Sequence, residues 1–145
     1  MPGSPPEPLT AQDRLDIGDL LASYSRCLDT GDVDGYVSLF APDGVLDGQG
    51  GPRAGVAALR RVAQAIAAAA AAPPVQGQRH FAGQPVIEGD RQRAVVRSYF
   101  LLLRQSPSGE PLIRAMGEYL DACVQHSGRW VFARREIRLL LGQFG

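Results

Sequence analysis

The apolar residues between positions 13 and 40 recur at intervals of three and four, the spacing of one helical face. The first set is Ile17, Leu20, Leu21, Tyr24 and Leu28. Gly31 ends this predicted helix, and Asp32 can cap a second one. The second set is Val33, Tyr36, Val37 and Phe40. The pattern predicts two amphipathic helices that meet at a tight glycine turn and cover one side of the fold.

The flanking segments predict a flexible tail and a third helix. Residues 1–9 hold four prolines, so we expect a flexible tail followed by a single domain over 10–145. Residues 45–47 are expected to form a short strand, and the glycine-rich stretch 48–55 a loop that acts as a mobile flap. An alanine-rich third helix is predicted over 55–72, where a Pro-Pro pair ends it.

The period changes after residue 77, where extended runs replace the helical spacing. The four runs are 78–88, 91–104, 110–126 and 130–141. Short turns rich in Gly, Ser, Pro and Asp separate them, so we expect an antiparallel meander of long, bent strands. Both side-chain parities of the second run are largely apolar, which indicates that helices cover one sheet face and a second subunit the other. Helices first and strands afterwards are typical of an α+β fold.

Composition excludes several classes of protein. The chain has 145 residues, 45% hydrophobic and 21% charged, with 15 basic and 15 acidic side chains. This balance argues against binding to nucleic acid or to an anionic membrane through bulk charge. No run is long and apolar enough for a membrane span, and the first residues lack a signal-peptide pattern, so we expect a cytoplasmic protein. Cys27 and Cys123 are expected to be reduced thiols, and His80 and His126 lack partners at metal-ligand spacing.

Six short motifs and a helix start at Gly55 follow one another along the chain. The motifs are Ile17–Asp29, Gly31–Asp34, Leu39–Gly44, Arg79–Phe81, Gly117–Asp121 and Gly128–Arg135. In this order they resemble the SnoaL-like branch of the nuclear-transport-factor-2-like (NTF2-like) superfamily. The resemblance implies a cone-shaped α+β barrel, with three N-terminal helices packed on a bent antiparallel sheet around an interior pocket. Proteins of this fold include dehydratases, isomerases, cyclases, hydrolases, dioxygenase small subunits and modules that only bind, so the fold leaves the function open.

The resemblance also nominates Tyr24, Asp29 and His80 as catalytic residues. A histidine oriented by a carboxylate can remove a proton next to a carbonyl, and a tyrosine hydroxyl can polarise that carbonyl. Neither a metal nor an organic cofactor is needed for this chemistry. Each residue also has an ordinary structural interpretation, as a core tyrosine, a carboxylate bonded to the Gly31 turn and an exposed histidine at a strand start.

Further residues are expected to line the pocket and bind the substrate. They are Phe40, Leu46, Ser98, Phe100, Met116, Phe132 and Arg135, the last as a ligand for a carboxylate or phosphate. Whether Arg134 or Arg135 faces the cavity stays open at this point. The aromatic members favour a bulky apolar substrate such as a polyketide, terpenoid or steroid-like ring.

Three functions are compatible with this sequence. The first is a cofactor-independent lyase or isomerase of the dehydratase or cyclase type, which forms a homodimer or homotrimer through the outer sheet face. The second is the small (beta) subunit of a ring-hydroxylating dioxygenase. The third is a non-catalytic protein that binds a small apolar molecule.

Overall fold

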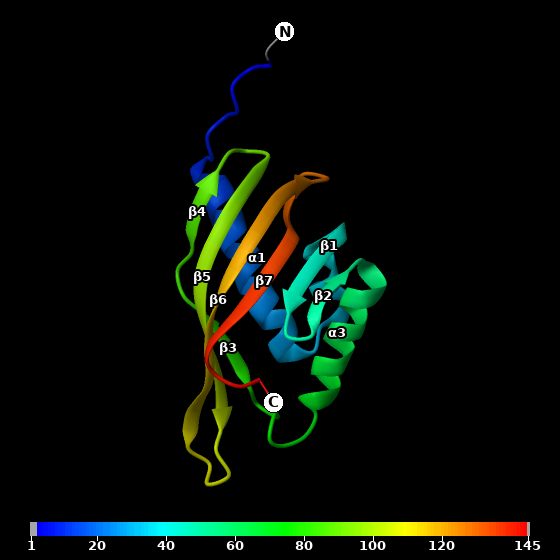
Figure 1. Ribbon diagram of the computed structural model, residues 1–145, viewed down its shortest axis with the longest axis vertical. Helices are drawn as coiled ribbons and strands as arrows, with labels where there is room; N and C mark the ends of the chain where they lie inside the picture. The colour runs from blue at the N-terminus through cyan, green and yellow to red at the C-terminus, as the bar shows by residue number, and fades with distance from the viewer. Residues whose placement is uncertain (1–2, 145) are drawn as a thin grey trace.

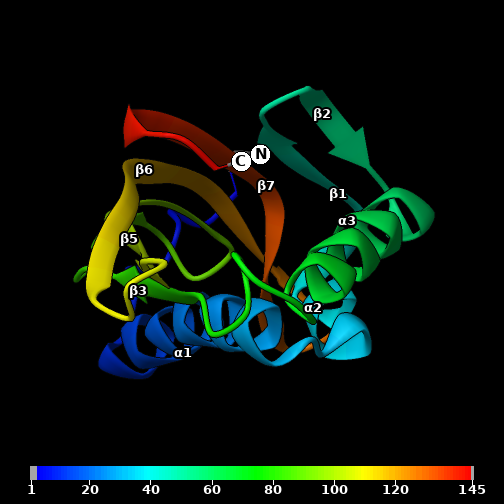
Figure 2. The same ribbon diagram turned by 90° about the horizontal axis from the view of Figure 1, so that it is seen from below.

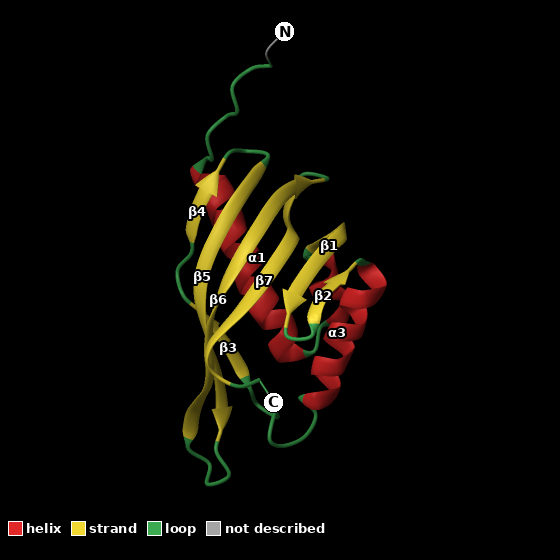
Figure 3. Ribbon diagram, viewed as in Figure 1, coloured by secondary structure: helices red, strands yellow, loops and turns green. Residues whose placement is uncertain are grey.

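The computed structural model describes residues 3–144 as three helices and seven strands. In chain order these are α1 Ala11–Thr30, α2 Val33–Ser38, β1 Phe40–Gly48, β2 Gly51–Ala54, α3 Val56–Ala69, β3 Arg79–Ala82, β4 Val86–Gly89, β5 Arg93–Gln105, β6 Pro111–His126 and β7 Arg129–Gly142. Figures 1 and 3 show α1 behind the long strands and α3 beside the β1–β2 hairpin, and Figure 2 shows all three helices on one side of the curved sheet. The α+β class and the three-helix arrangement expected from the sequence are confirmed.

Capping side chains fix the start and end of α1. The Thr10 hydroxyl accepts from the backbone N–H of Asp13, and the Asp13 carboxylate accepts from the backbone N–H of Thr10. Asp13 also accepts a hydrogen bond from the indole N–H of Trp130, which joins this helix end to β7. At the other end Gly31 adopts a left-handed conformation (φ 71°), and Asp32 then caps α2 through the Gly35 N–H.

The sheet has the strand order β2-β1-β7-β6-β5-β3, and β4 pairs with the same strand as β3. All pairs are antiparallel except β1 with β7, which is parallel. The sheet is therefore mixed, whereas the sequence predicted only antiparallel pairs. The turn-length argument holds for β5 to β7, but β1 reaches β7 through most of the chain and no short turn constrains its direction. The sheet curves strongly without closing (Figure 2).

Several of the expected segments differ from the structure. The strand expected over 45–47 is longer, because β1 already begins at Phe40, which the sequence assigned to the second helix. The run 78–88 is divided into β3 and β4, because the pairing with β5 shifts by one residue between Ala82–Phe100 and Val86–Arg97, and Pro85 has no N–H to donate. The expected loop 48–55 contains β2, which forms a hairpin with β1, and Arg53 in β2 donates to the carbonyls of Gln49 and Gly51. The segment expected to be a flap is thus part of a β-hairpin.

The core lies between the concave face of the sheet and the helices. From Arg93 to Phe100 the side chains of β5 alternate between exposed and buried, and Val96 and Phe100 are at most 1% exposed. The opposite face of the same strand exposes Val95 and Tyr99. This exposed apolar surface is consistent with the expected subunit contact, which stays a prediction.

The proline-rich tail touches the body of the protein at its last residues. The carbonyl of Glu7 accepts from the backbone N–H of Arg91, and Pro8 bridges to Asp90. Leu9 packs against the core. None of the helices within residues 3–144 is long and apolar enough to cross a membrane.

Gly117 gives a test of the close packing where β6 bulges against β7. A Cβ added there would lie 2.4 Å from the Arg138 carbonyl oxygen and 2.6 Å from the Phe100 ring. We expect Gly117→Ala to lower the free energy of unfolding by about 1 to 3 kcal/mol, because backbone and a buried ring must both move. Urea denaturation followed by circular dichroism measures this.

Gly18, in the middle of α1, is the matched control. A Cβ there meets nothing within 4 Å. Gly18→Ala should raise the free energy of unfolding by up to about 1 kcal/mol, the helix-propensity difference. Equal effects of the two substitutions would contradict the packing described here.

Candidate functional site

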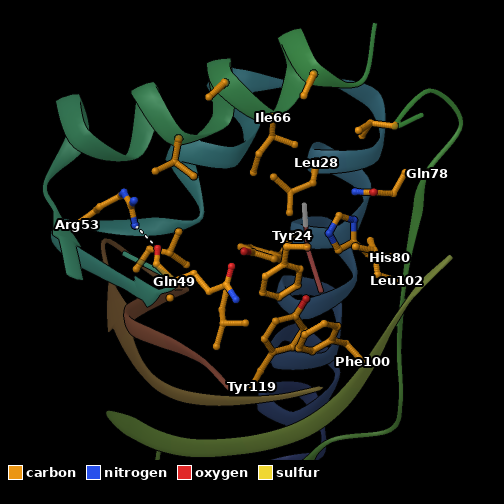
Figure 4. Close-up of a pocket in the computed structure, with 18 of the residues that line it drawn as sticks. Tyr24, Leu28, Gln49, Arg53, Ile66, Gln78, His80, Phe100, Leu102 and Tyr119 are labelled. Atoms are coloured by element: carbon orange, nitrogen blue, oxygen red, sulfur yellow. Dashed lines mark hydrogen bonds between the residues drawn. The ribbon is translucent and has the colours of Figure 1, made fainter. Parts of the chain in front are cut away.

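A cavity of about 720 Å³ lies between the concave sheet, α1, α3 and the β1–β2 hairpin. Most of its wall is apolar. This part of the wall includes Leu28, Leu46, Ile66, Phe100, Leu102 and Ile137. Polar groups are few, and Figure 4 shows Gln78 and His80 at one end of the cavity with Arg53 at the other. Such a mainly apolar hollow with a few polar groups is typical of small-molecule sites.

Asp29 fixes the position of His80. Its carboxylate oxygen lies 2.8 Å from the imidazole Nδ1, and both oxygens accept from the His80 backbone N–H at 3.1 and 3.2 Å. These bonds explain why a carboxylate is found in the last turn of α1, where the helix dipole disfavours it. With Nδ1–H donated to Asp29, the Nε2 lone pair is left to accept a proton. Asp29 itself borders a smaller pocket, of about 480 Å³, on the far side of His80.

Two buried tyrosines add hydroxyl groups to the cavity lining. Tyr24 from α1 and Tyr119 from β6 are each 2% exposed, and both line the cavity. Burial raises the pKa of both hydroxyls above their ordinary value, even though the Arg135 guanidinium acts in the opposite direction. Both side chains therefore remain protonated phenols, which can donate hydrogen bonds to a molecule in the cavity.

Arg135 lies beneath these tyrosines and outside the cavity. It is fully buried and donates two hydrogen bonds of 2.8 Å to Asp121. Burial disfavours its charge, but the Asp121 carboxylate outweighs that effect and raises the pKa of Arg135. The guanidinium carbon lies 4.2 Å from the Tyr24 ring centre and 3.7 Å from that of Tyr119. Arg135 thus contacts the tyrosine rings and is not part of the cavity wall, while Arg134 pairs with Asp47 on the exposed side.

The structure brings some of the predicted lining residues together and separates others. Leu46 and Phe100 line the cavity. Phe40 and Phe132 pack on each other in the core, with ring centres 5.3 Å apart, and the buried Ser98 is not part of the cavity wall.

Met116 is also absent from the wall. It pairs with Leu101, the neighbour of Phe100, so it lies on the opposite face of the sheet.

Sequence reasoning missed six polar residues that line the cavity: Gln49, Arg53, Arg61, Gln78, Arg104 and Tyr119. Strand parity contained the signal for two of them. Tyr119 has the parity of the buried Asp121, and Arg104 continues the inward parity of Phe100 and Leu102. Gln78 precedes β3 and has no such signal.

A family model described as SnoaL-like domain matches residues 9–136. No sequence match was found among curated proteins.

Solved structures with the same fold come from several bacteria. A Mycobacterium tuberculosis protein of unknown function, Rv3472, is 30% identical, with a TM-score of 0.77 over 87% of this chain and 70% of that one. A Nostoc punctiforme protein of unknown function with a cystatin-like fold is 28% identical, with a TM-score of 0.80 over 92% and 95%. A proposed scytalone dehydratase from Novosphingobium aromaticivorans is 23% identical, with a TM-score of 0.75 over 90% and 85%.

The buried ion pair gives a stability prediction. Arg135→Met should lower the free energy of unfolding by about 3 to 5 kcal/mol, because the buried Asp121 carboxylate loses its partner. Urea denaturation measures the loss. Adding Asp121→Leu to the same chain should restore part of the stability, and a double variant as unstable as the sum of the single ones would contradict the pairing.

The buried tyrosines give a pH prediction, tested in a Tyr99→Phe background that removes the exposed tyrosine. Burial raises the pKa of Tyr24, Tyr36 and Tyr119 in the folded protein. Their contribution to stability is therefore complete below the unfolded value of about 10 and is lost as the pH rises above it. Tyrosinate absorbance should appear only together with alkaline loss of the circular dichroism signal. Ionisation of any of the three in folded protein near pH 10 would contradict the burial.

Proposed function

We propose that this chain, which belongs to the SnoaL-like domain family, is a cofactor-independent lyase or isomerase for a bulky apolar small molecule. The observation that carries the proposal is that His80, on the wall of a largely apolar cavity, is hydrogen-bonded to the mostly buried carboxylate of Asp29. The fold shared with a proposed scytalone dehydratase adds nothing specific to the chemistry.

His80 is proposed as the general base. Its Nδ1–H bond to Asp29 holds the ring in one tautomer and leaves Nε2 to remove a proton from a carbon next to a carbonyl. The carboxylate then lies 2.8 Å from the imidazolium that forms and stabilises its charge. Side-chain exposures of 12% and 11% for the two groups mean that little water competes for this interaction.

Tyr24 is proposed as the acid that supports the developing enolate, with Tyr119 as a second donor. Because both phenols are protonated and turned to the same cavity as His80, they can donate to the substrate carbonyl oxygen as it becomes negative (Figure 4). The positive guanidinium of Arg135 below their rings favours that redistribution of charge.

The fate of the enolate decides the reaction class. Return of the proton from His80 to a different carbon gives an isomer. Departure of a β-hydroxyl, protonated by the imidazolium or by Tyr24, gives an elimination with water as the second product. Attack of the enolate carbon on a second carbonyl, whose oxygen then takes the proton from the imidazolium, gives a ring that carries a hydroxyl group. The shared first step is proton removal at His80.

Hydrogen–deuterium exchange of 2-tetralone in D₂O tests this first step, because the probe is a bulky apolar ketone with acidic neighbouring C–H bonds. We expect the protein to accelerate exchange over buffer, measured by proton NMR. His80→Gln should slow the catalysed exchange by about 10² to 10⁴-fold, the usual contribution of a positioned base.

Two companion variants make the result specific. Asp29→Asn should also slow exchange, because it removes the charge that stabilises the imidazolium. His126→Gln, at the exposed β6–β7 turn, should exchange at the wild-type rate. Full exchange activity in His80→Gln would refute the mechanism, and binding of the ketone without any exchange would favour the binding-only function.

A further inference from the structure

We propose that the substrate of this site is an apolar molecule that carries one carboxylate, and that Arg104 binds this carboxylate beside His80. The proposal deepens the proposed function and rests on it for the identity of the reacting end. It assigns to Arg104 the anion-binding role that the sequence suggested for Arg135.

Register places Arg104 at the reacting end of the cavity. Leu102 in β5 is the direct partner of His80 in β3, and Arg104 follows Leu102 by two residues on the same face. Two residues of a strand span about 7 Å. A carboxylate on Arg104 therefore leaves the carbon a few bonds away within reach of the imidazole.

Two of the five guanidinium N–H groups of Arg104 are used within the protein. Nε donates to the side-chain oxygen of Gln78, and Nη2 donates to the carbonyl of Phe144 at 2.7 Å. These bonds hold the planar group in place. Nη1 and the second Nη2 hydrogen have no acceptor within residues 3–144, so an edge of the guanidinium is left for a two-point bond to a carboxylate.

The charges around the cavity are unbalanced. Three arginines line it (Arg53, Arg61 and Arg104), and no aspartate or glutamate does so in the part of the chain that the structure describes. Four of the nine other arginines in the strands pair with a carboxylate, as Arg135 does with Asp121. No aspartate or glutamate lies within ion-pair distance of Arg104 in residues 3–144.

Arg114 strengthens the positive charge at this end. It is the extra residue of the β6 bulge, between the pairs Leu102 with Ala115 and Leu103 with Ile113. Its buried Nε has no hydrogen-bond partner. Burial and the nearby Arg114 charge lower the pKa of Arg104. A bound anion would relieve this repulsion.

The other two arginines of the wall are less suited to the role. Arg53 uses Nη1 to hold the hairpin carbonyls of Gln49 and Gly51, and it lies at the opposite end from His80 (Figure 4). Arg61 is exposed on α3. Only Arg104 combines a held guanidinium, unused donors and proximity to His80.

Isothermal titration calorimetry with 2-naphthoate and its neutral amide, 2-naphthamide, tests the proposal without requiring turnover. We expect wild-type protein to bind naphthoate about tenfold more tightly than naphthamide, the equivalent of one charge-assisted contact. Arg104→Gln should abolish this preference and keep the affinity for naphthamide, and Arg104→Lys should restore part of it.

Arg97→Gln is the matched control, because Arg97 lies on the same strand with its side chain on the exposed face. It removes the same charge and should keep the full preference for naphthoate. His80→Gln should also keep it, which separates this proposal from the proposed reaction. If His80→Gln keeps the preference for naphthoate and the wild-type protein shows no exchange activity, the carboxylate-binding site is supported and the proposed reaction is refuted.

Four outcomes would overturn the proposal. They are equal affinity for the two probes, a preference for naphthoate that survives Arg104→Gln, no detectable binding of naphthoate, and loss of the binding of both probes in Arg104→Gln. The last outcome would assign Arg104 to the architecture of the cavity through Gln78 and Phe144.

Discussion

The ion pair between Arg135 and Asp121 determines the arrangement of the cavity floor. The two residues lie opposite each other on β7 and β6 and form two parallel hydrogen bonds without any exposed side-chain surface. The remaining guanidinium nitrogen, Nη1, has no conventional acceptor and is surrounded by aromatic rings. Such a charge can be buried only if its carboxylate and the ring faces are all in place.

The rings over this ion pair come from different elements, so the pair couples helix packing to the sheet. Tyr24 belongs to α1, Tyr119 to β6 and Phe132 to β7. A shift of α1 along the sheet would remove the Tyr24 ring from the buried guanidinium and leave its charge less well compensated. The position of Tyr24 in the cavity thus depends on an ion pair that lies outside the cavity wall. At the other end of the same helix, Asp29 fixes β3 through His80, so α1 sets the positions of both proposed catalytic side chains.

The sequence predicted those features that depend on local spacing. Helical periodicity located α1 and its buried face, and the glycine turn after it, because adjacent residues alone determine them. It did not predict that β1 runs parallel to β7, because that pairing joins distant segments. The prediction of which residues line the cavity was partly wrong for the same reason. Met116 and Phe100 share an aromatic or apolar character, but only register shows that they point to opposite faces. Arg135 has the residue type of an anion ligand, yet its role depends on Asp121, which a motif search along the chain does not place beside it.

The charged groups in this protein differ in how completely each is compensated. Arg135 is neutralised by Asp121, and a protonated His80 would be stabilised by Asp29, before any ligand arrives. Arg104 has only neutral acceptors, Gln78 and a backbone carbonyl. A neutral ligand would leave its positive charge at the very end of the cavity where the imidazolium must form, and two like charges there oppose proton removal. A carboxylate on the substrate supplies the missing negative charge at that point. The same contact that selects an anionic molecule would therefore also make His80 a better base once that molecule is bound.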